Sequence, residues 1–381
     1  MAKGAKEHKT VLLLDFASEK NRGDAAMQVA TVALVRKYFP AHRPVVTTVF
    51  GYNQHPECLR EFDHTNEDEN LVFVGGLFRT NEQFGTTNTS RSSKWQKVSA
   101  VLRGGLFVLV FALPGLRRSL RWHRGEAFQS AWQAFHQADI VIWNGRNFRS
   151  HSRVAEPFDI FLLLANPLLC ICLRKPMVCI GASVWKLHHP VSKWLLRFVL
   201  RRCQFVSVRE SASAENLKTI LPAADQQAVA VLPDLSFYAL SEFERALPKR
   251  NPPRADLHTV VTTIVGEREI GDHDMFVAYT NALNQLFQTL ITKHGSHIIV
   301  VPQVSFAPES NQAAVAAATT SLPPEQLTII QGDQMIPDLL RQYQQADLLI
   351  ATRMHSAIFA AWVGTPVLAC TYDSGAKWRI L

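Results

Sequence analysis

The chain has 381 residues, of which 47% are hydrophobic and 19% are charged. This composition excludes a disordered or fibrous chain, and the length predicts about two globular domains. The formal net charge of +8 suits an anionic ligand, whether polyanion, anionic membrane surface or phosphorylated substrate. We expect no nucleic-acid partner, because the sequence has no helix-turn-helix signature, zinc-finger spacing or RNP-like aromatic motif.

The six cysteines include no CxxC pair, and most stand in apolar runs. They are therefore expected to be buried free thiols, with neither a metal site nor a disulfide. The first nine residues are charged and contain no apolar segment of the kind found in signal peptides. From these features we expect a cytoplasmic protein.

Two apolar segments bear on membrane contact. Residues 104–113 are apolar but too short to span a bilayer, which takes about 20 residues. Their flanks are basic and contain Trp95 and Trp122. The insert at about 91–124 is therefore either a buried helix with solvated ends or a peripheral contact with an anionic membrane surface. Residues 158–173 contain Asn166-Pro167 and are expected to form a core helix or a helix pair.

Strands and helices alternate along the first half of the chain, which is typical of parallel sheets covered on both faces. A helix is expected at 24–38 and a polar loop at 53–70. The expected strands are 11–14, 45–49, 71–74, 139–143, 177–180, 205–208 and 229–232.

A charged, proline-bearing stretch at 241–254 predicts a linker, after which the alternation resumes. Expected strands are 259–264, 298–301, 327–330, 346–351 and 367–368, with helices at 274–294, 312–319, 337–345 and 356–363. The domains are therefore placed at 1–240 and 255–381. The predicted fold class is α/β, with two Rossmann-like domains that face a central cleft.

The last of these strands stops at Thr352-Arg353-Met354-His355, and an alanine-rich helix follows. Ligands of open α/β sheets bind outside the carboxyl ends of the strands. Arg353 offers a fixed cation for phosphate or carboxylate, and His355 offers a proton that moves near neutral pH. This pair is the strongest candidate for chemistry in the sequence.

Three further turns follow strands. In Asn21-Arg22-Gly23-Asp24, the glycine allows close approach of a ligand and Asp24 can cap the next helix. The strand at 139–143 ends in Asn144-Gly145, and Arg209 directly follows the strand at 205–208. Arg209 either binds an anion at this rim or forms a surface ion pair with Glu210 or Asp234.

Together these residues resemble the polysaccharide pyruvyl transferases. The resemblance runs in order through Asn21-Arg-Gly-Asp24, 139–145, 207–213, 232–237, Arg353-Met-His355, Gly364-Thr-Pro366 and Tyr372-Asp373-x3-Lys377. It implies a GT-B-like fold. The implied reaction transfers a pyruvyl group from phosphoenolpyruvate to two hydroxyls of a sugar, which yields a cyclic ketal and phosphate.

Carried over by position, Arg209 and Arg353 match the anion-binding arginines of the family, and His355 matches its proposed catalytic histidine. Two arginines can hold the phosphate and carboxylate of such a donor, and a histidine can act as general acid or base. Asn21, Gly23, Asp24, Asn144 and Gly145 are expected to bind substrate, and Tyr372 and Lys377 complete the candidate set. No cofactor is implied beyond phosphoenolpyruvate as co-substrate.

The sequence departs from the family pattern in three places. Asn144-Gly145-Arg146 replaces a run of glycines, and the stretch after Gly181 carries His188-His189, which either face the cleft or form a solvated loop. The chain stops at Leu381, where further helix is expected to close the second domain, so that domain is expected to be truncated.

The acceptor is expected to be a saccharide of a polysaccharide or, if the insert is interfacial, of a lipid-linked oligosaccharide. Two other functions stay open at this point. One is a GT-B glycosyltransferase with a nucleotide-sugar donor, and the other is a noncatalytic protein that binds anions or polysaccharides.

Overall fold

The structure is a computed structural model that describes residues 9–51, 57–65, 70–77, 125–144, 147–150, 153–243, 257–305 and 308–371. The insert at 91–124, most of the linker, and Gly145, Tyr372 and Lys377 lie outside these residues. The chain divides into two compact units. Unit 1 comprises Met1–Ser18 and Gln28–Leu235, and unit 2 comprises Glu19–Met27 and Ser236–Leu381. The expected division at residues 240 and 255 did not foresee that Glu19–Met27 groups with the second half.

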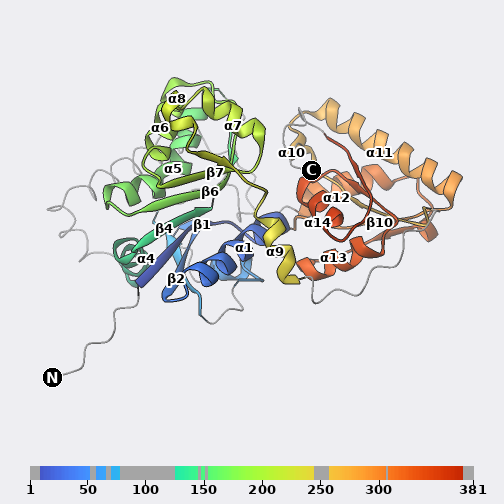
Figure 1. Cartoon of the computed structure of the whole chain (residues 1–381). Helices are drawn as coiled ribbons and strands as arrows, with labels where there is room; N and C mark the ends of the chain where they lie inside the picture. The colour runs from blue at the N-terminus through green and yellow to red at the C-terminus, as the bar shows by residue number, and fades with distance from the viewer. Residues whose placement is uncertain are drawn as a thin grey trace. The chain divides into compact units, whose positions relative to one another are not determined.

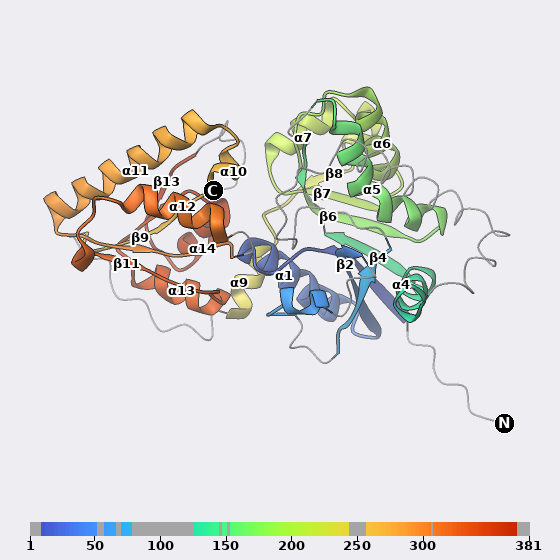
Figure 2. The ribbon, with the colours of Figure 1, turned by 180° about the vertical axis from the view of Figure 1, so that it is seen from behind.

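Unit 1 contains a parallel sheet in the order β3-β2-β1-β4-β6-β7-β8, with β5 paired to β6. Its strands are β1 (Lys9–Phe16), β2 (His42–Gly51), β3 (Val72–Gly76), β4 (Ile140–Asn144), β5 (Asn147–Phe148), β6 (Met177–Val184), β7 (Phe205–Val208) and β8 (Val229–Val231). Its helices are α1 (Arg22–Tyr38), which begins in unit 2, α4 (Glu126–Gln137), α5 (Glu156–Cys172), α6 (Pro190–Leu200), α7 (Ser211–Lys218), α8 (Ala223–Gln226) and the 3-10 helix η2 (Glu57–Glu61). Figures 1 and 2 show these elements.

Different helices cover the two faces of the unit 1 sheet, and successive side chains of β1 point alternately to one face and the other. Val11 and Leu13 pack in one core with Val32 and Val35 of α1. Leu12 and Leu14 point the other way, into a core shared with α4, α5 and α6. The sheet is thus covered on both faces, which explains why its strands are apolar runs rather than alternating patterns.

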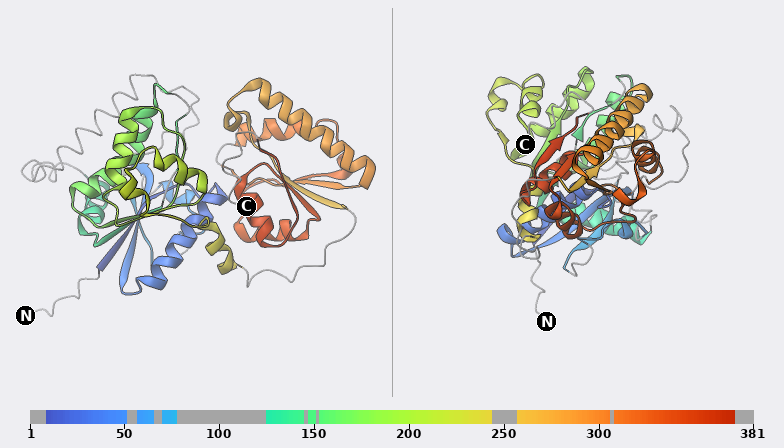
Figure 3. Two further views of the ribbon diagram at one scale, coloured as in Figure 1. Left: turned by 45° about the horizontal axis from the view of Figure 1, so that its top comes forward. Right: turned by 90° about the vertical axis from the view of Figure 1, so that its right-hand side faces the viewer.

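Unit 2 contains a second parallel sheet in the order β11-β10-β9-β12-β13. Its elements are α9 (Ser236–Phe243), β9 (Thr259–Thr263), α10 (Glu267–Ile270), α11 (His273–His294), β10 (His297–Val300), α12 (Pro308–Thr319), η5 (Pro324–Gln326), β11 (Leu327–Ile329), α13 (Ile336–Gln345), β12 (Leu348–Ala351), α14 (Met354–Trp362) and β13 (Val367–Ala369). One face packs on α11 and α12 through Val260, Ile298 and Ile350. Figure 3 shows α13 and α14 on the opposite side of this sheet from α11.

Nearly all of the expected strands and long helices are confirmed. The alternative of a helix pair at 158–173 is wrong, because α5 is one helix with Pro167 inside it. The expected loop at 53–70 contains the short helix η2. The five cysteines whose side chains are described are free, as predicted, but only Cys170 and Cys179 are buried, and the other three are half-buried. Across the described residues, no helix has both the length and the hydropathy that a bilayer crossing needs.

Candidate functional site

Arg353 and His355 stand at the point where the strand order of unit 2 reverses. The sheet runs outward from β9 in both directions, and Ala351 at the end of β12 pairs with Thr263 at the end of β9. In doubly wound sheets, the carboxyl ends of two such strands frame the ligand-binding crevice. The expected place of the Arg-x-His pair at a strand tip is therefore confirmed.

Hydrogen bonds fix the turn from β12 into α14. The hydroxyl of Thr352 donates to the carbonyl of Thr263, and the hydroxyls of Thr263 and Ser356 lie 2.9 Å apart. Ser356 Oγ in turn donates to the carbonyl of Arg353 at 2.5 Å. These contacts tie the start of α14 to the end of β9, so the backbone that carries Arg353 and His355 is held on both sides.

The guanidinium of Arg353 is only partly engaged. Its Nη2 donates to Glu269 Oε1 and to Asn311 Oδ1, each at 3.2 Å. Nε and Nη1 donate to no residue in the described part of the chain. The side chain is 14% exposed. A guanidinium in this state can still donate from Nε and Nη1, which point in different directions, to oxygens of a carboxylate or phosphate.

Tyr279 of α11 lies beneath this turn. Its hydroxyl accepts a hydrogen bond from the backbone N–H of Val265 at 3.2 Å. Burial raises the pKa of Tyr279 to about 12, although a hydrogen bond with Thr352 and the charge of Arg353 act in the opposite direction. The phenol is therefore neutral at physiological pH and packs as an uncharged support under Arg353.

The ring of His355 lies directly over Gly23. A Cβ atom built on Gly23 would come within 2.0 Å of His355 Nδ1 and 2.4 Å of its Cγ. No side chain fits in that space unless the imidazole moves. The glycine of the Asn21–Asp24 turn is thus required because the candidate catalytic histidine approaches it, and binding of substrate by Gly23 stays a prediction.

Four side chains, centred on the carboxylate of Asp333, hold the segment that carries Gly23. Arg22 is 1% exposed, and its Nη1 donates to the carbonyl of Glu19 at 2.8 Å while its Nη2 pairs with Asp333. Lys20 Nζ binds the same carboxylate at 2.5 Å, and Ser305 Oγ donates to it at 2.7 Å. Burial raises the pKa of Asp333, but these hydrogen bonds and the charge of Arg22 lower it by more, so the group stays ionised.

Asn21, rather than Asp24, caps helix α1. Asn21 Oδ1 accepts from the backbone N–H of Gly23 at 3.1 Å, and Asn21 Nδ2 donates to Asp24 Oδ2 at 2.9 Å. The capping role expected of Asp24 is wrong, because Asn21 precedes the helix and Asp24 already lies in its first turn. Binding of substrate by Asn21 and Asp24 stays a prediction.

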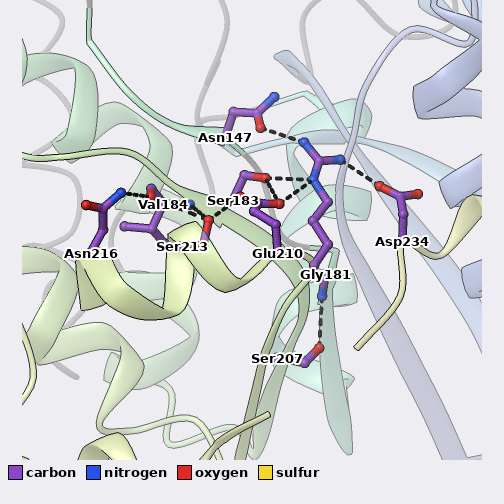
Figure 4. A network of polar contacts seen from close by, with 10 residues as sticks. Asn147, Gly181, Ser183, Val184, Ser207, Glu210, Ser213, Asn216 and Asp234 are labelled. Atoms are coloured by element: carbon purple, nitrogen blue, oxygen red, sulfur yellow. Dashed lines mark hydrogen bonds and ion pairs between the residues drawn. The ribbon is translucent and has the colours of Figure 1, made fainter. Parts of the chain in front are cut away.

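Arg209 belongs to unit 1 and differs sharply from Arg353. Its Nη1 binds Asp234 at 3.0 Å, its Nε donates to Ser183 at 2.6 Å, and its Nη2 donates to Asn147 at 2.7 Å. Glu210 lies 3.5 Å from Nε. The guanidinium and both carboxylates are buried, and Figure 4 shows the network around them. The ion pair considered as an alternative is present with both expected acids, but it is buried rather than at the surface. Binding of the donor by Arg209 stays a prediction.

Asn144 stands at the equivalent reversal point of unit 1. It ends β4, which pairs with β1 where the strand order turns, and it is 8% exposed. Its Nδ2 donates to the hydroxyl of Thr31 in α1 at 3.1 Å. The side chain therefore ties strand to helix, and its role toward substrate stays a prediction.

His188 and His189 form a turn built around a buried carboxylate. Glu156 accepts from the backbone N–H of His188 at 3.0 Å and of His189 at 2.8 Å. Burial raises the pKa of Glu156, but these bonds and one from Ser192 lower it by more. His188 is exposed, and His189 Nδ1 accepts from Val191 N at 3.2 Å to cap α6. These contacts match the solvated loop considered for the pair.

Sequence patterns did not reveal the partners of Arg353. Glu269 and Asn311 come from α10 and α12, far along the chain from β12, and neither stands in a motif. The one signal in the sequence is that Glu269 and Asn311 each lie near the start of a helix that follows a strand. Many other residues share that position. Asp234, the partner of Arg209, was foreseen as an ion-pair candidate.

Comparison with known proteins identifies a family and several structures that are similar to the chain. A family model described as polysaccharide pyruvyl transferase matches residues 21–374. No curated protein sequence matches the chain. Among solved structures, a Listeria monocytogenes protein assigned as a UDP-N-acetylglucosamine 2-epimerase superposes with a TM-score of 0.56 at 14% identity, covering 95% of this chain and 79% of that one.

Two further epimerase structures are similar to the chain. UDP-GlcNAc 2-epimerase from Methanocaldococcus jannaschii has a TM-score of 0.53 at 10% identity, over 98% of this chain and 91% of that one. The enzyme from Neisseria meningitidis, bound to UDP-GlcNAc, has a TM-score of 0.53 at 14% identity, over 97% and 89%. Likeness at these identities concerns the fold alone, and it confirms the GT-B-like α/β architecture.

Proposed function

Because the chain belongs to the polysaccharide pyruvyl transferase family, we propose that it transfers a pyruvyl group from phosphoenolpyruvate to two hydroxyls of one sugar in a saccharide acceptor. The product is a cyclic pyruvate ketal and the by-product is phosphate. The observation that carries this proposal is the pair of groups at the tip of β12, a partly engaged guanidinium and an imidazole fixed over a glycine.

Arg353 is proposed to bind the donor. Phosphoenolpyruvate carries a phosphate and a carboxylate, and Nε and Nη1 can each donate one charge-assisted hydrogen bond to an oxygen of either group. Glu269 and Asn311 each lie 3.2 Å from Nη2 and hold that atom, so the directions of Nε–H and Nη1–H are set before phosphoenolpyruvate binds. A fixed cation also stabilises the negative charge that grows on phosphate as it leaves.

His355 is proposed to move the proton. Addition begins when the methylene carbon of the donor gains a proton and a sugar hydroxyl attacks the neighbouring carbon, losing its own proton. The second hydroxyl then attacks the same carbon and displaces phosphate, so the two hydroxyl protons balance the new methyl group and the released phosphate. An imidazole is suited to either proton transfer near neutral pH, and the proposal covers both.

The acceptor is proposed to be a saccharide unit of a polysaccharide or of a lipid-linked oligosaccharide. The test incubates the full chain with phosphoenolpyruvate and a panel of acceptors that bear galactose, mannose or N-acetylhexosamine. Phosphate release and an acceptor mass gain equal to a pyruvate ketal are the expected results. Without acceptor, phosphate release should stay at background.

Two results would overturn the proposal. Consumption of a nucleotide sugar in place of phosphoenolpyruvate would identify a glycosyltransferase. Turnover that survives His355→Ala, while Arg353→Ala only weakens binding of the donor, would remove the proton-transfer role. A matched control is His273→Ala, because His273 is an exposed histidine of the same unit whose only described partner is Glu267. That variant should turn over like the wild type.

A further inference from the structure

Helix α6 of unit 1 has two distinct faces. Ser192, Leu196, Val199 and Leu200 are buried against the unit. The opposite side leaves Trp194 60% exposed and Val191 46% exposed. Single exposed apolar side chains are ordinary, but a Trp and a Val one turn apart on the same stripe of a helix form a continuous apolar ridge.

The ridge continues through an ordered aromatic pair. Trp194 stacks on Phe198, with ring centroids 5.6 Å apart and planes inclined by 30°. The guanidinium of Arg202 lies 3.5 Å above the centre of the Phe198 ring, and its Nη1 donates to the carbonyl of Phe198 at 3.0 Å. The cation and the rings are thus held together at the surface.

The flank of this ridge is basic. Residues 190–204 contain four basic side chains and no acidic one. Lys193 and Arg197 are one turn apart beside the ridge, and neither forms an ion pair with a described residue. Arg201 is paired, with Asp225 at 2.9 Å. We define the α6 patch as Val191, Lys193, Trp194, Arg197, Phe198 and Arg202.

An exposed tryptophan ridge beside basic side chains without ion pairs has the features of a surface that contacts lipid headgroups. Indole rings sit at the level of lipid headgroups, where one side is apolar and the other wet. Lys and Arg side chains next to them are attracted to anionic lipid. Each one near the membrane contributes about 1 kcal/mol to the binding free energy, or roughly fivefold in affinity. A neutral saccharide would stack on the rings but would leave the basic row without a counter-charge.

From these observations we infer that the α6 patch docks unit 1 on an anionic lipid surface. Trp194 and Val191 enter the headgroup layer, and the basic side chains face lipid phosphates. The inference concerns α6 and does not depend on the insert at 91–124. It needs neither donor nor acceptor, so it can be tested independently of the proposed reaction.

The test is co-sedimentation of the full chain with phosphatidylcholine vesicles, prepared with and without phosphatidylglycerol. The wild type should bind the anionic vesicles only, and added salt should weaken binding because it screens exposed charges. The double variant Lys193→Glu and Arg197→Glu should reduce affinity more than 25-fold, at about fivefold or more for each charge. Trp194→Ser should reduce affinity about tenfold, because roughly half of a large apolar side chain loses its burial.

Matched controls come from other exposed positions. Tyr38→Ser removes an aromatic ring that is 64% exposed at the end of α1, and Lys293→Glu reverses a charge in the last turn of α11. Both should bind vesicles like the wild type. Thermal unfolding of each variant checks that its fold is intact, because Lys193 is half-buried and Trp194 packs on Phe198.

Three outcomes would overturn the inference. Failure of the wild-type chain to bind anionic vesicles would end the proposal. Unchanged binding of the α6 variants would assign lipid contact to another segment. If the α6 variants lost binding to an isolated polysaccharide but still bound vesicles, the patch would be a saccharide-binding site instead.

Discussion

Arg353 and Arg209 carry the same charge but differ in what surrounds them. Arg353 has one carboxylate partner, and Arg209 has two within 3.5 Å. Truncation of Arg353 should therefore cost binding of the donor rather than stability. We expect Arg353→Ala to lower kcat/KM for phosphoenolpyruvate by about 10²–10³-fold, the usual cost of one preorganised charge-stabilising group. Steady-state kinetics and a thermal melt measure the two effects, and an unaltered kcat/KM would exclude Arg353 from the donor site.

Truncation of Arg209 should instead destabilise unit 1. Asp234 and Glu210 are buried, and without the cation both would be left uncompensated. Removal of one partner of such a pair costs about 3–5 kcal/mol of unfolding free energy. Urea denaturation of Arg209→Ala measures this loss. The control is Arg341→Ala, whose ion pair with Asp338 is 45–48% exposed and should contribute less than about 1 kcal/mol. Equal losses in both variants would contradict a structural role for Arg209.

Gly23 is expected to control the position of His355. In Gly23→Ala the new methyl group would lie 2.0 Å from His355 Nδ1, so the ring must shift. A displacement of about 1 Å at a catalytic group costs on the order of 10²-fold in rate. We expect that loss in kcat with little change in KM for the donor. Gly125→Ala is the control, because a Cβ there meets no atom within 4 Å. Normal turnover by Gly23→Ala would show that the reaction does not depend on the position of His355.

At the scale of elements, Glu156 links the start of α5 to the turn before α6. Its carboxylate accepts the backbone N–H groups of His188 and His189, and its pKa is lowered. A lowered folded-state pKa stabilises the protein above the unfolded value near 4.5, and this contribution is lost as the pH falls through the folded value. Glu156→Gln should cost about 2 kcal/mol at pH 7. Urea titrations should show this difference shrinking below about pH 4.5, and a constant difference would contradict the role of the charge.

Most strands and several long helices could be predicted because buried strands and long helices leave a strong apolar pattern, although α4 and α6 were not foreseen. The strands β1, β9 and β12 read as apolar runs since helices cover both faces of each sheet. Short elements were missed for the opposite reason. The two-residue strand β5 and the 3-10 helix η2 bury too little apolar surface to leave a period in the sequence.

Within the candidate site, the sequence located the residues that end strands but not the partners that hold them. Arg353 and His355 follow β12 directly, and that position is visible in the pattern. Glu269 and Asn311 reach Arg353 from sequence separations of 84 and 42 residues. Such contacts depend on the packing of α10 and α12, which no local pattern records. The same holds for Gly23, whose need for a glycine depends on a ring 332 positions later in the chain.

At the scale of the whole molecule, the chain does not divide into two consecutive halves. Glu19–Met27 groups with unit 2, although β1 before it and the rest of α1 after it group with unit 1. Asn21 pairs with Val304, and Ser305 N donates to the carbonyl of Lys20 at 3.0 Å. The second unit therefore includes a turn from the start of the chain, and that turn supplies the glycine under His355.

This arrangement makes Asp333 a remote determinant of activity. Its carboxylate binds Arg22 and Lys20 on either side of Asn21, and Arg22 is almost completely buried. Asp333→Asn keeps the shape but removes the charge, so it should lower stability by about 1 kcal/mol, because the carboxylate is itself partly exposed.

The same substitution should lower kcat, because a loosened turn no longer holds Gly23 beneath the imidazole. We expect a loss of about tenfold, smaller than for Gly23→Ala, since the backbone bonds of the turn persist. Kinetics and unfolding measured on one preparation separate the two effects. Asp338→Asn, which removes an exposed ion pair from the same unit, is the control and should leave kcat unaltered. A stability loss without a fall in kcat would show that the turn anchors unit 2 without positioning His355.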